Sequence, residues 1–500
     1  METSNTFDDA ARTNFIKRVA RAGVVGAGGG GLPAYMKFLA ASVAAPAIDT
    51  VIANGVECEP LLASDKTLMK HWPLKVISGL ELSTQMCGAR QGILALKREN
   101  HDIVDGFARI IEKKHQQKIY SSQFQVKLHL VDSYYPAGDE FILVHDATGR
   151  IIAEGQLPLS QGVIVHNVLT LAQLAQIDSG SAIVDRFVTI AGAVKQPKVF
   201  IVPIGTPLRE LLKRMEMSGP AQNLKIIDGG PMMGKVLERS TVADILNGSS
   251  NFFINKRTSG IIILPQDHTL IRMKELSVHD VIRRSKSVCC QCFRCTEFCP
   301  RSLLGHSLNP HKTMRSVDYN LSIPTEIITS AFLCSQCGVC DSFACDIMGL
   351  SPKKILGEYK KLLLQRGIKN PHHFHPQKTK EGQNFHKVPT HALLKKLDLV
   401  GYINAGNVKN SDYEVIDPTL IPKVSISLAE HIGEPAQAIV GVGAMVRLGD
   451  LVAISPQMRQ WLELERTANA TSIGSAYHAS ISGKVAEVTS QHIVIESCES

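Results

Sequence analysis

The residues with the clearest chemical pattern are cysteines. Of the twelve in the chain, most lie between positions 289 and 345, in the segments SVCCQCFRCTEFCPRS and LCSQCGVCDSFACD. The first segment has the spacing C-x2-C-x2-C-x3-C-P at Cys289, Cys292, Cys295 and Cys299, and the second has C-x2-C-x2-C-x4-C at Cys334, Cys337, Cys340 and Cys345. Thiolates in such runs ligate [4Fe–4S] clusters, so the sequence predicts two of them.

Each cluster is expected to take ligands from both segments. Three thiolates at two-residue gaps can wrap one face of a cluster, whereas the fourth cysteine lies too far along the chain and ligates the other cluster in two-cluster ferredoxins. We therefore assign one cluster to Cys289, Cys292, Cys295 and Cys345, and the other to Cys334, Cys337, Cys340 and Cys299. A pair of zinc sites is the alternative, but these typically show separated C-x-x-C pairs instead of triplets.

The remaining cysteines fall outside the repeat. Cys290 adjoins Cys289, and either could begin the first motif; the register favours Cys289. Asp346 follows the last cysteine where proline is common, which we interpret as a variation of the turn. Three isolated cysteines, Cys58, Cys87 and Cys498, are interpreted as small buried apolar residues.

A second chemical feature is the glycine-rich stretch VVGAGGGGLPAYMKF. Residues 9–22 before it have helical periodicity, and the proline at position 33 begins another predicted helix. Backbone N–H groups at such a loop form a natural phosphate cradle, to which Lys37 can add a positive charge. A Rossmann fingerprint would have to follow a strand, so the G-x-G-x-x-G match is weak on its own, and a plain flexible loop is the alternative.

The elements that must position these groups alternate between strands and helices. DTVIANGVECEPLLASDKTLM reads as a buried strand, an acidic turn with Glu57, Glu59 and Asp65, and a helix. HLVDSYYPAGDEFIL and GVIVHNVLTL repeat the order strand, polar turn, helix. This alternation predicts an α/β fold, in which polar groups at strand ends can bind a flavin ring or a ribose.

Composition limits the possible classes of protein. The length of 500 residues exceeds one hydrophobic core and predicts several domains. The net charge is +8, but Lys and Arg are scattered, so no nucleic-acid partner is expected. The N-terminal segment lacks a secretory signal, and no apolar stretch is long enough to span a membrane, so we expect a cytoplasmic protein with no transmembrane segment.

Taken together, these motifs resemble a known family. The glycine loop, NGVECEP, YPAGDE, HNVLT, GGPMMG and the two cysteine segments occur in the order found in a flavo-iron-sulfur family. That family comprises the propanediol-utilization cobalamin reductases of bacterial microcompartments, the C subunit of the Rnf complex and the 51-kDa subunit of complex I. The resemblance covers nearly the whole chain.

The resemblance implies a multidomain α/β and α+β protein. Its parts would be an FMN/NADH-binding α/β domain at 1–180, a β-grasp soluble-ligand-binding domain at 181–270, a helical two-[4Fe–4S] ferredoxin-type domain at 275–365, a linker at 366–424 and a barrel-sandwich hybrid domain at 425–500. The last domain lacks the lysine that would carry lipoate or biotin, so a structural role is expected. The histidines of PHHFHP are interpreted as part of a solvated linker, with a metal site as the alternative.

The resemblance also implies the cofactor contacts. The phosphate would be held by Gly26, Gly28, Gly29, Gly30, Gly31 and Lys37. The isoalloxazine and ribityl contacts would be Asn54, Glu57, Glu59, Tyr135, Gly138, Asn167 and Thr170, with Asp139 and Glu140 near the flavin or nicotinamide. The chain departs from the family pattern at Gly30, Leu32, Ala34 and His166. No acid-base catalytic residue is expected.

The function that the resemblance implies is an NADH-dependent reductase. Electrons from NADH would reach cobalamin by way of FMN and two [4Fe–4S] clusters, and so support regeneration of adenosylcobalamin. A corrinoid adenosyltransferase and microcompartment shell proteins are the expected partners, inside or beside a microcompartment. The alternatives are an electron relay to a flavodoxin, ferredoxin or glycyl-radical activase, and a scaffold in which the clusters only stabilise the fold.

Overall fold

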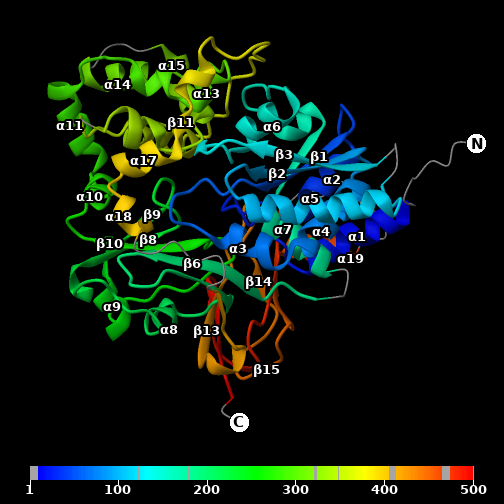
Figure 1. Ribbon diagram of the computed structural model, residues 1–500. Coiled ribbons are helices and arrows are strands. Elements are labelled where there is room, and N and C mark those ends of the chain that lie inside the picture. Colours follow the sequence, from blue (N-terminus) through cyan, green and yellow to red (C-terminus); the bar gives the residue numbers. More distant parts are fainter. Residues whose placement is uncertain are drawn as a thin grey trace, which may run out of the picture.

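The computed structural model describes residues 9–120, 124–177, 181–319, 324–346, 348–404, 413–463 and 473–498. The first eight residues of the N-terminal segment and residues 405–412 of the expected linker lie outside this set. Figure 1 shows a helix-flanked sheet at the upper right, a helical region at the upper left, a second sheet across the middle, and small C-terminal sheets below. No helix in the described part of the chain is long and apolar enough to cross a membrane.

The first sheet is entirely parallel, with the order β3-β2-β1-β5. Its strands are β1 (Thr50–Gly55), β2 (Gln91–Lys97), β3 (Gln125–Val131) and β5 (Val163–Asn167). Its helices are α1 (Asp9–Arg21), α2 (Ala34–Ser42), α3 (Ser64–His71), α4 (Pro73–Met86), α5 (His101–Gln116), α6 (Glu140–Thr148) and α7 (Val168–Ile177). The predicted α/β alternation is confirmed, and a helix, not a strand, precedes the glycine loop.

Packing of this sheet brings the polar strand ends together. β1 and β2 are almost wholly buried, as expected for parallel strands covered on both faces. Asn54 at the end of β1 is in register with Asn167 at the end of β5. Helices α4 and α7 touch closely because Gly79 has no side chain: a Cβ there would lie 1.9 Å from the Leu171 carbonyl oxygen.

The second sheet is mixed, with the order β12-β7-β6-β10-β8-β9. Its strands are β6 (Asp185–Gly192), β7 (Lys198–Pro203), β8 (Leu224–Asp228), β9 (Lys235–Thr241), β10 (Gly260–Pro265) and β12 (Tyr413–Val415). Its helices are α8 (Leu208–Leu212), α9 (Val242–Asn247) and α10 (Thr269–Glu275). The β6–β10 and β7–β12 pairs are parallel and the others antiparallel.

The cysteine segments lie in a region built from short helices. These are α11 (Val278–Val288), α12 (Arg294–Glu297), α13 (Pro300–Leu303), α14 (Pro310–Tyr319), α15 (Thr325–Thr329) and α16 (Pro352–Gln365), with a π-helical turn at Cys340–Ala344. Its apolar core is small, which is typical of regions that cofactors help to stabilise.

The C-terminal region consists of two antiparallel sheets, β13-β19-β18-β15 and β14-β16-β17. Their elements are β13 (Lys423–Ser427), β14 (Gln437–Ala438), β15 (Met445–Val446), β16 (Leu451–Ile454), α19 (Pro456–Glu463), β17 (Ala476–His478), β18 (Gly483–Val488) and β19 (His492–Glu496). These sheets share a hydrophobic core with the second sheet. Helix α19 packs on the first domain, where Trp461 stacks on Tyr35 with ring centroids 5.3 Å apart.

The segment 366–424 differs from the solvated linker expected from its sequence. It contains β11 (Val388–Pro389), α17 (Thr390–Lys396) and α18 (Val400–Asn404), and β12 follows. Strand β11 pairs with β4 (Tyr134–Tyr135) of the first domain, and β12 extends the second sheet. His375 donates to the Ile151 carbonyl (2.8 Å), and His372 lies 3.0 Å from the Thr329 hydroxyl. The segment is polar because it lies at the surface, but main-chain pairing holds it in place.

Short 3-10 helices complete the described chain. They are η1 (Pro158–Gln161), η2 (Ala221–Asn223), η3 (Ser330–Leu333), η5 (Gln383–His386) and η6 (Pro418–Leu420).

Candidate functional site

The eight motif cysteines gather around two separate cavities. An outer cavity is lined by Cys289, Cys292, Cys295 and Cys345, and an inner one by Cys299, Cys334, Cys337 and Cys340. This is the crossed arrangement expected from the spacing: each triplet is joined by the fourth cysteine of the other segment. In the part of the chain that is described, no group of three or more Cys, His, Asp or Glu side chains is placed to hold a single metal ion.

The backbone between the cysteines adopts the same unusual conformation in both triplets. Gln291 and Gln336 occupy equivalent positions, and both have positive φ, 55° and 61°. Phe293 and Gly338 are also equivalent, with φ of 62° and 82°. Non-glycine residues adopt such angles rarely, and they do so where a local structure requires it. The two segments are thus one ligand-binding turn used twice.

The two glutamines also bond to ligand sulfurs. The Gln291 Nε2 donates to the Cys289 Sγ and the Gln336 Nε2 to the Cys334 Sγ, each at 3.2 Å. Hydrogen bonds to sulfur stabilise a thiolate and tune the potential of a cluster. These glutamines were missed in the sequence, although their equivalent positions in the repeated CxQC pattern could have revealed them.

The two cavities differ in depth. Cys299, Cys337 and Cys340 of the inner cavity are buried, whereas Cys292 of the outer cavity is exposed. Burial raises the pKa of Cys299 to about 11 and that of Cys337 to about 12, so these thiols are neutral until a cation binds. A cluster iron supplies that charge, and the cysteine sets therefore fit two clusters.

The cysteines outside the repeat are placed differently from one another. Cys290 borders the outer cavity but is exposed. Cys87 is buried, as expected, and Cys58 is largely buried; burial raises the pKa of each to about 12. The expectation that Cys498 is buried was wrong: it is exposed and lies two residues after β19, outside the sheet.

The glycine loop forms a tight turn between α1 and α2. Gly26 donates to the Leu32 carbonyl (2.8 Å), and the Ala27 N–H donates to the Thr170 hydroxyl (3.0 Å). A Cβ on Gly29 or Gly30 would meet nothing within 4 Å. Within the described residues, the N–H groups of the turn at 28–30 have no hydrogen-bond acceptor. Unpaired N–H groups in a turn with open space beside it fit a phosphate, so the loop can hold the phosphate of FMN.

Two acidic residues meet beside this loop at the strand ends. The Glu57 carboxylate accepts from the N–H groups of Asp65 and Lys66 at the start of α3 (3.2 and 3.3 Å). Asp65 accepts from the Asn167 amide (2.6 Å), and Asn167 also lies beside Gly28. Burial raises the pKa of both carboxyls, and repulsion from Asp65 raises that of Glu57 further. Protonated carboxyls can donate hydrogen bonds to a flavin ring.

Lys37 and Asn54, two further residues expected to bind the flavin, bond to neighbouring backbone and side-chain groups. The Lys37 ammonium donates to the Val165 carbonyl (2.5 Å) and pairs with Glu140 at 3.4 Å. In the described chain, Lys37 therefore contacts β5 and the first residue of α6, and not the glycine loop. The Asn54 amide donates to the Gly138 carbonyl (2.8 Å), in a turn where a side chain on Gly138 would collide with the Val56 carbonyl.

Three expected flavin contacts instead face other parts of the chain. Glu59 accepts from the N–H groups of Met232 and Met233 in the GGPMMG loop (2.9 and 2.7 Å). The Tyr135 hydroxyl donates to the Cys337 carbonyl at 2.8 Å. Asp139 forms a bidentate ion pair with Arg301 (2.7 and 3.0 Å). The contacts of Tyr135 and Asp139 join this region to the inner cysteine cavity, which Cys337 and Arg301 line.

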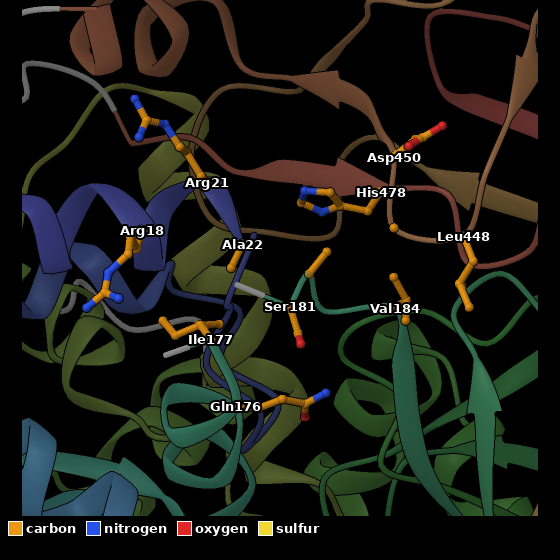
Figure 2. Close-up of a pocket in the computed structure, with 12 residues that line it drawn as sticks. Arg18, Arg21, Ala22, Gln176, Ile177, Ser181, Val184, Leu448, Asp450 and His478 are labelled. Carbon is orange, nitrogen blue, oxygen red and sulfur yellow. The ribbon is translucent and has the colours of Figure 1, made fainter. Parts of the chain in front are cut away.

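A further cavity lies elsewhere in the described part of the chain (Figure 2). Its volume is about 680 Å³, and its labelled side chains come from the end of α1, the end of α7, the segment before β6 and the C-terminal region. None of the residues expected to bind a cofactor lines it. Its walls are partly exposed arginines and aliphatic groups, and it lies apart from the cysteine cavities.

Comparisons with known proteins agree with these two sites. The chain matches the Nuo51 FMN-binding domain over residues 19–176 and the 4Fe-4S dicluster domain over residues 288–350. The first range contains the glycine loop and the polar strand ends, and the second contains all eight motif cysteines. The chain therefore has an FMN-binding domain and a 4Fe-4S dicluster domain.

Similarity to curated proteins extends over the whole chain. It is 32% identical over 496 residues to the cobalamin reductase PduS of Citrobacter freundii, covering 99% of this chain and 98% of that one. It is 32% identical over 480 residues to PduS of Salmonella typhimurium, covering 96% and 95%. The C subunit of the Na+-translocating ferredoxin:NAD+ oxidoreductase complex of Acetobacterium woodii is 31% identical over 299 residues, or 59% of each chain.

Proposed function

Because the chain belongs to the family of the cobalamin reductase PduS and has an FMN-binding domain and a 4Fe-4S dicluster domain, we propose that it transfers electrons from NADH to a cobalamin. In this proposal FMN is held at the glycine loop and the polar strand ends, and one [4Fe–4S] cluster at each cysteine cavity. The chain is an electron-transfer flavo-iron-sulfur oxidoreductase; NADH as the donor and cobalamin as the acceptor are the proposed part.

The observation that carries the proposal is the direct connection between the two sites. Tyr135 lies in the flavin-site segment and bonds to the backbone of Cys337, and Asp139 in the same segment pairs with Arg301, two residues after Cys299. The flavin segment therefore touches the inner cavity on two sides. Such a connection keeps the two sites close together, as transfer of electrons between them requires.

The cofactors supply the electron chemistry: a flavin exchanges electron pairs as well as single electrons, and clusters exchange single electrons. The residues of the chain hold and orient these groups. Glycine N–H groups receive a phosphate, while Glu57, Asp65 and Asn167 present polar groups at the strand ends. Three of the four cysteines that line the inner cavity are buried, whereas the exposed Cys292 places the outer cavity at the surface.

The outer cavity supports a second candidate function, an electron relay to a redox protein. Helix α11, which leads into Cys289, exposes Arg283, Arg284 and Lys286. Exposed bases beside a surface cavity attract an acidic partner such as a flavodoxin, a ferredoxin or an activase. In either case the proposed location is the cytoplasm, within or attached to a microcompartment, with an adenosyltransferase and shell proteins as candidate partners.

The decisive experiment is anaerobic oxidation of NADH by the reconstituted protein with cobalamin, flavodoxin or ferredoxin as the acceptor. If the proposal is correct, cobalamin supports turnover, and the Cys295→Ser variant bleaches its flavin with NADH but reduces cobalamin more slowly. Cys498→Ser is the matched control, because Cys498 is exposed and lies outside both cavities. Turnover with flavodoxin or ferredoxin but not with cobalamin would favour the relay, and no oxidation of NADH with any acceptor would reject both functions.

A further inference from the structure

The back of the glycine loop is held by residues from distant parts of the chain. Arg186, in β6, donates to the Ala27 carbonyl at 2.7 Å. Arg257, in the segment before β10, donates through its Nε to the Gly29 carbonyl at 3.0 Å. The N–H of Ile432, in the C-terminal region, donates to the Gly31 carbonyl at 2.8 Å. Three alternate carbonyls of the loop therefore point toward the second sheet and the C-terminal region.

Fixing these carbonyls also fixes the direction of the N–H groups that follow them. In a planar trans peptide, the C=O of one residue and the N–H of the next point in opposite directions. When Arg186 holds the Ala27 carbonyl, the Gly28 N–H is turned away from it. When Arg257 holds the Gly29 carbonyl, the same is true of the Gly30 N–H. These N–H groups are among those that lack an acceptor within the described chain.

The hydrogen bond from Gly26 to the Leu32 carbonyl closes the ends of the loop but involves none of the peptide groups at 27–30. Gly29 and Gly31 have φ of +88° and +69°, and glycine is conformationally the least restricted residue. The loop would sample many peptide orientations without outside contacts, and each would have to be ordered when a phosphate binds. Contacts that order the loop in advance reduce this cost.

The two arginines differ in their surroundings. Arg186 is 3% exposed, and it also donates to the Thr258 carbonyl at 2.8 Å. Burial lowers its pKa to about 10, so it keeps its positive charge at neutral pH, helped by Asp65 and Glu430. Arg257 is exposed, but its side chain lies against Gly31, where a Cβ would be 3.1 Å from the Arg257 Cδ. Both charges lie behind the loop, where they also attract a dianion.

We propose that Arg186 and Arg257 are positioning residues for the flavin phosphate, because they hold the Ala27 and Gly29 carbonyls back and thereby aim the Gly28 and Gly30 N–H groups at it. The inference rests on the proposed binding of FMN at this loop and assigns part of its affinity to residues outside the 19–176 range that matches the FMN-binding domain. The second sheet thus becomes a component of the flavin site.

The test compares FMN with riboflavin, which lacks the phosphate. Flavin-free, full-length protein is titrated with each flavin, and binding is followed by quenching of flavin fluorescence. Arg257→Met should weaken FMN about tenfold and riboflavin less than about twofold, since a charge-assisted hydrogen bond to the loop is lost. Arg257→Lys keeps the charge but not the planar donor group, so its affinity for FMN should lie between that of wild type and that of Arg257→Met. Arg209→Met is the matched control, on an exposed arginine of α8 in the same domain.

Two results would overturn the inference. One is that Arg257→Met loses the same factor of affinity for FMN and for riboflavin, and the other is that Arg257→Met binds FMN as tightly as Arg209→Met does. Arg186→Met should cause a larger loss specific to FMN; if this buried substitution prevents folding, the Arg257 series decides alone. The proposed function is judged separately by the wild-type protein. If wild type shows no preference for FMN over riboflavin, the phosphate site itself is wrong, whereas a normal preference with an unaffected Arg257→Met removes only the role of the arginines.

Discussion

The ion pair between Asp139 and Arg301 allows a quantitative test of how the flavin domain is joined to the inner cysteine cavity. The two side chains are 13% and 9% exposed, and both oxygens of Asp139 accept from the guanidinium. The guanidinium carbon also lies 3.7 Å from the Phe141 ring centroid. Removing one partner of such a buried pair costs about 3–5 kcal/mol, because the other charge remains without compensation.

The substitution Asp139→Asn removes the charge while keeping the size of the side chain. Asp139 also caps α6 by accepting from Phe141 N–H and Ile142 N–H, and an asparagine oxygen can still do so. One hydrogen bond to Arg301 can survive as well. We therefore expect the free energy of unfolding to fall by about 2–3 kcal/mol, at or slightly below the lower end of that range.

The exposed pair of Asp132 and Arg98 provides the control. Its atoms are also 3.0 Å apart, but the side chains are 74% and 59% exposed, so Asp132→Asn should cost less than about 1 kcal/mol. Both variants are denatured anaerobically, and loss of cluster absorbance reports the transition. A double-mutant cycle with Arg301→Gln isolates the coupling between the two side chains. If Asp139→Asn and Asp132→Asn shift the transition equally, the pair does not hold the domains together.

Three further predictions test other parts of the site. Reconstituted protein should contain about eight irons per chain. Cys290→Ala should leave the iron content nearly unchanged, whereas Cys292→Ala or Cys337→Ala should lose about half of it. Loss of iron in Cys290→Ala would show that the register of the first motif is wrong. Burial and the charge of Asp65 raise the pKa of Glu57 to about 8 in the folded protein. As the pH rises from about 4.5 to about 8, Glu57 therefore ionises in the unfolded chain before it does so in the folded one, and the stability of the flavin-free protein falls over this window. The melting temperature of Glu57→Gln relative to wild type should therefore rise between pH 5 and pH 8, and parallel curves would contradict the buried, protonated state. Tyr135→Phe should leave iron content and FMN binding unchanged but slow the reduction of the clusters by NADH in rapid mixing; unchanged kinetics would remove Tyr135 from the connection.

Local patterns explain what could be predicted from the sequence. The cysteine spacing encodes a turn, and the turn places three sulfurs around one cavity, so the grouping of Cys334, Cys337 and Cys340 follows from short-range geometry. Their fourth partner, Cys299, comes from the other segment and was assigned from the ligand exchange of two-cluster ferredoxins. The strand and helix at 50–71 follow from hydrophobic periodicity in the same way. The coarse fold class is confirmed on this basis, whereas the expected domain boundaries stay a prediction.

Contacts between distant segments could not be predicted. Glu59 reads as a flavin ligand in NGVECEP, yet its partners are N–H groups of a loop more than 170 residues later. Backbone donors leave no mark in a sequence. The same is true of Arg186, one arginine among many until the fold places it behind Ala27. The strands inside the segment 366–424 could not be predicted for a related reason: β11 and β12 have too few residues to show a period of two.

The position of β12 has a consequence for biosynthesis. Tyr413 of β12 pairs with Val199 of β7, so β7 remains an unpaired edge strand until β12 is synthesised, roughly two hundred residues later. At a translation rate of about 5–20 residues per second, this delay is about 10–40 s. During that time the unpaired edge of β7 resembles the sheet edges that drive aggregation, while the cysteine segments have already left the ribosome. The cysteine segments and the edge of β7 can therefore be incomplete at the same time. A nascent chain that receives its iron late exposes both the free cysteines and the unpaired strand edge.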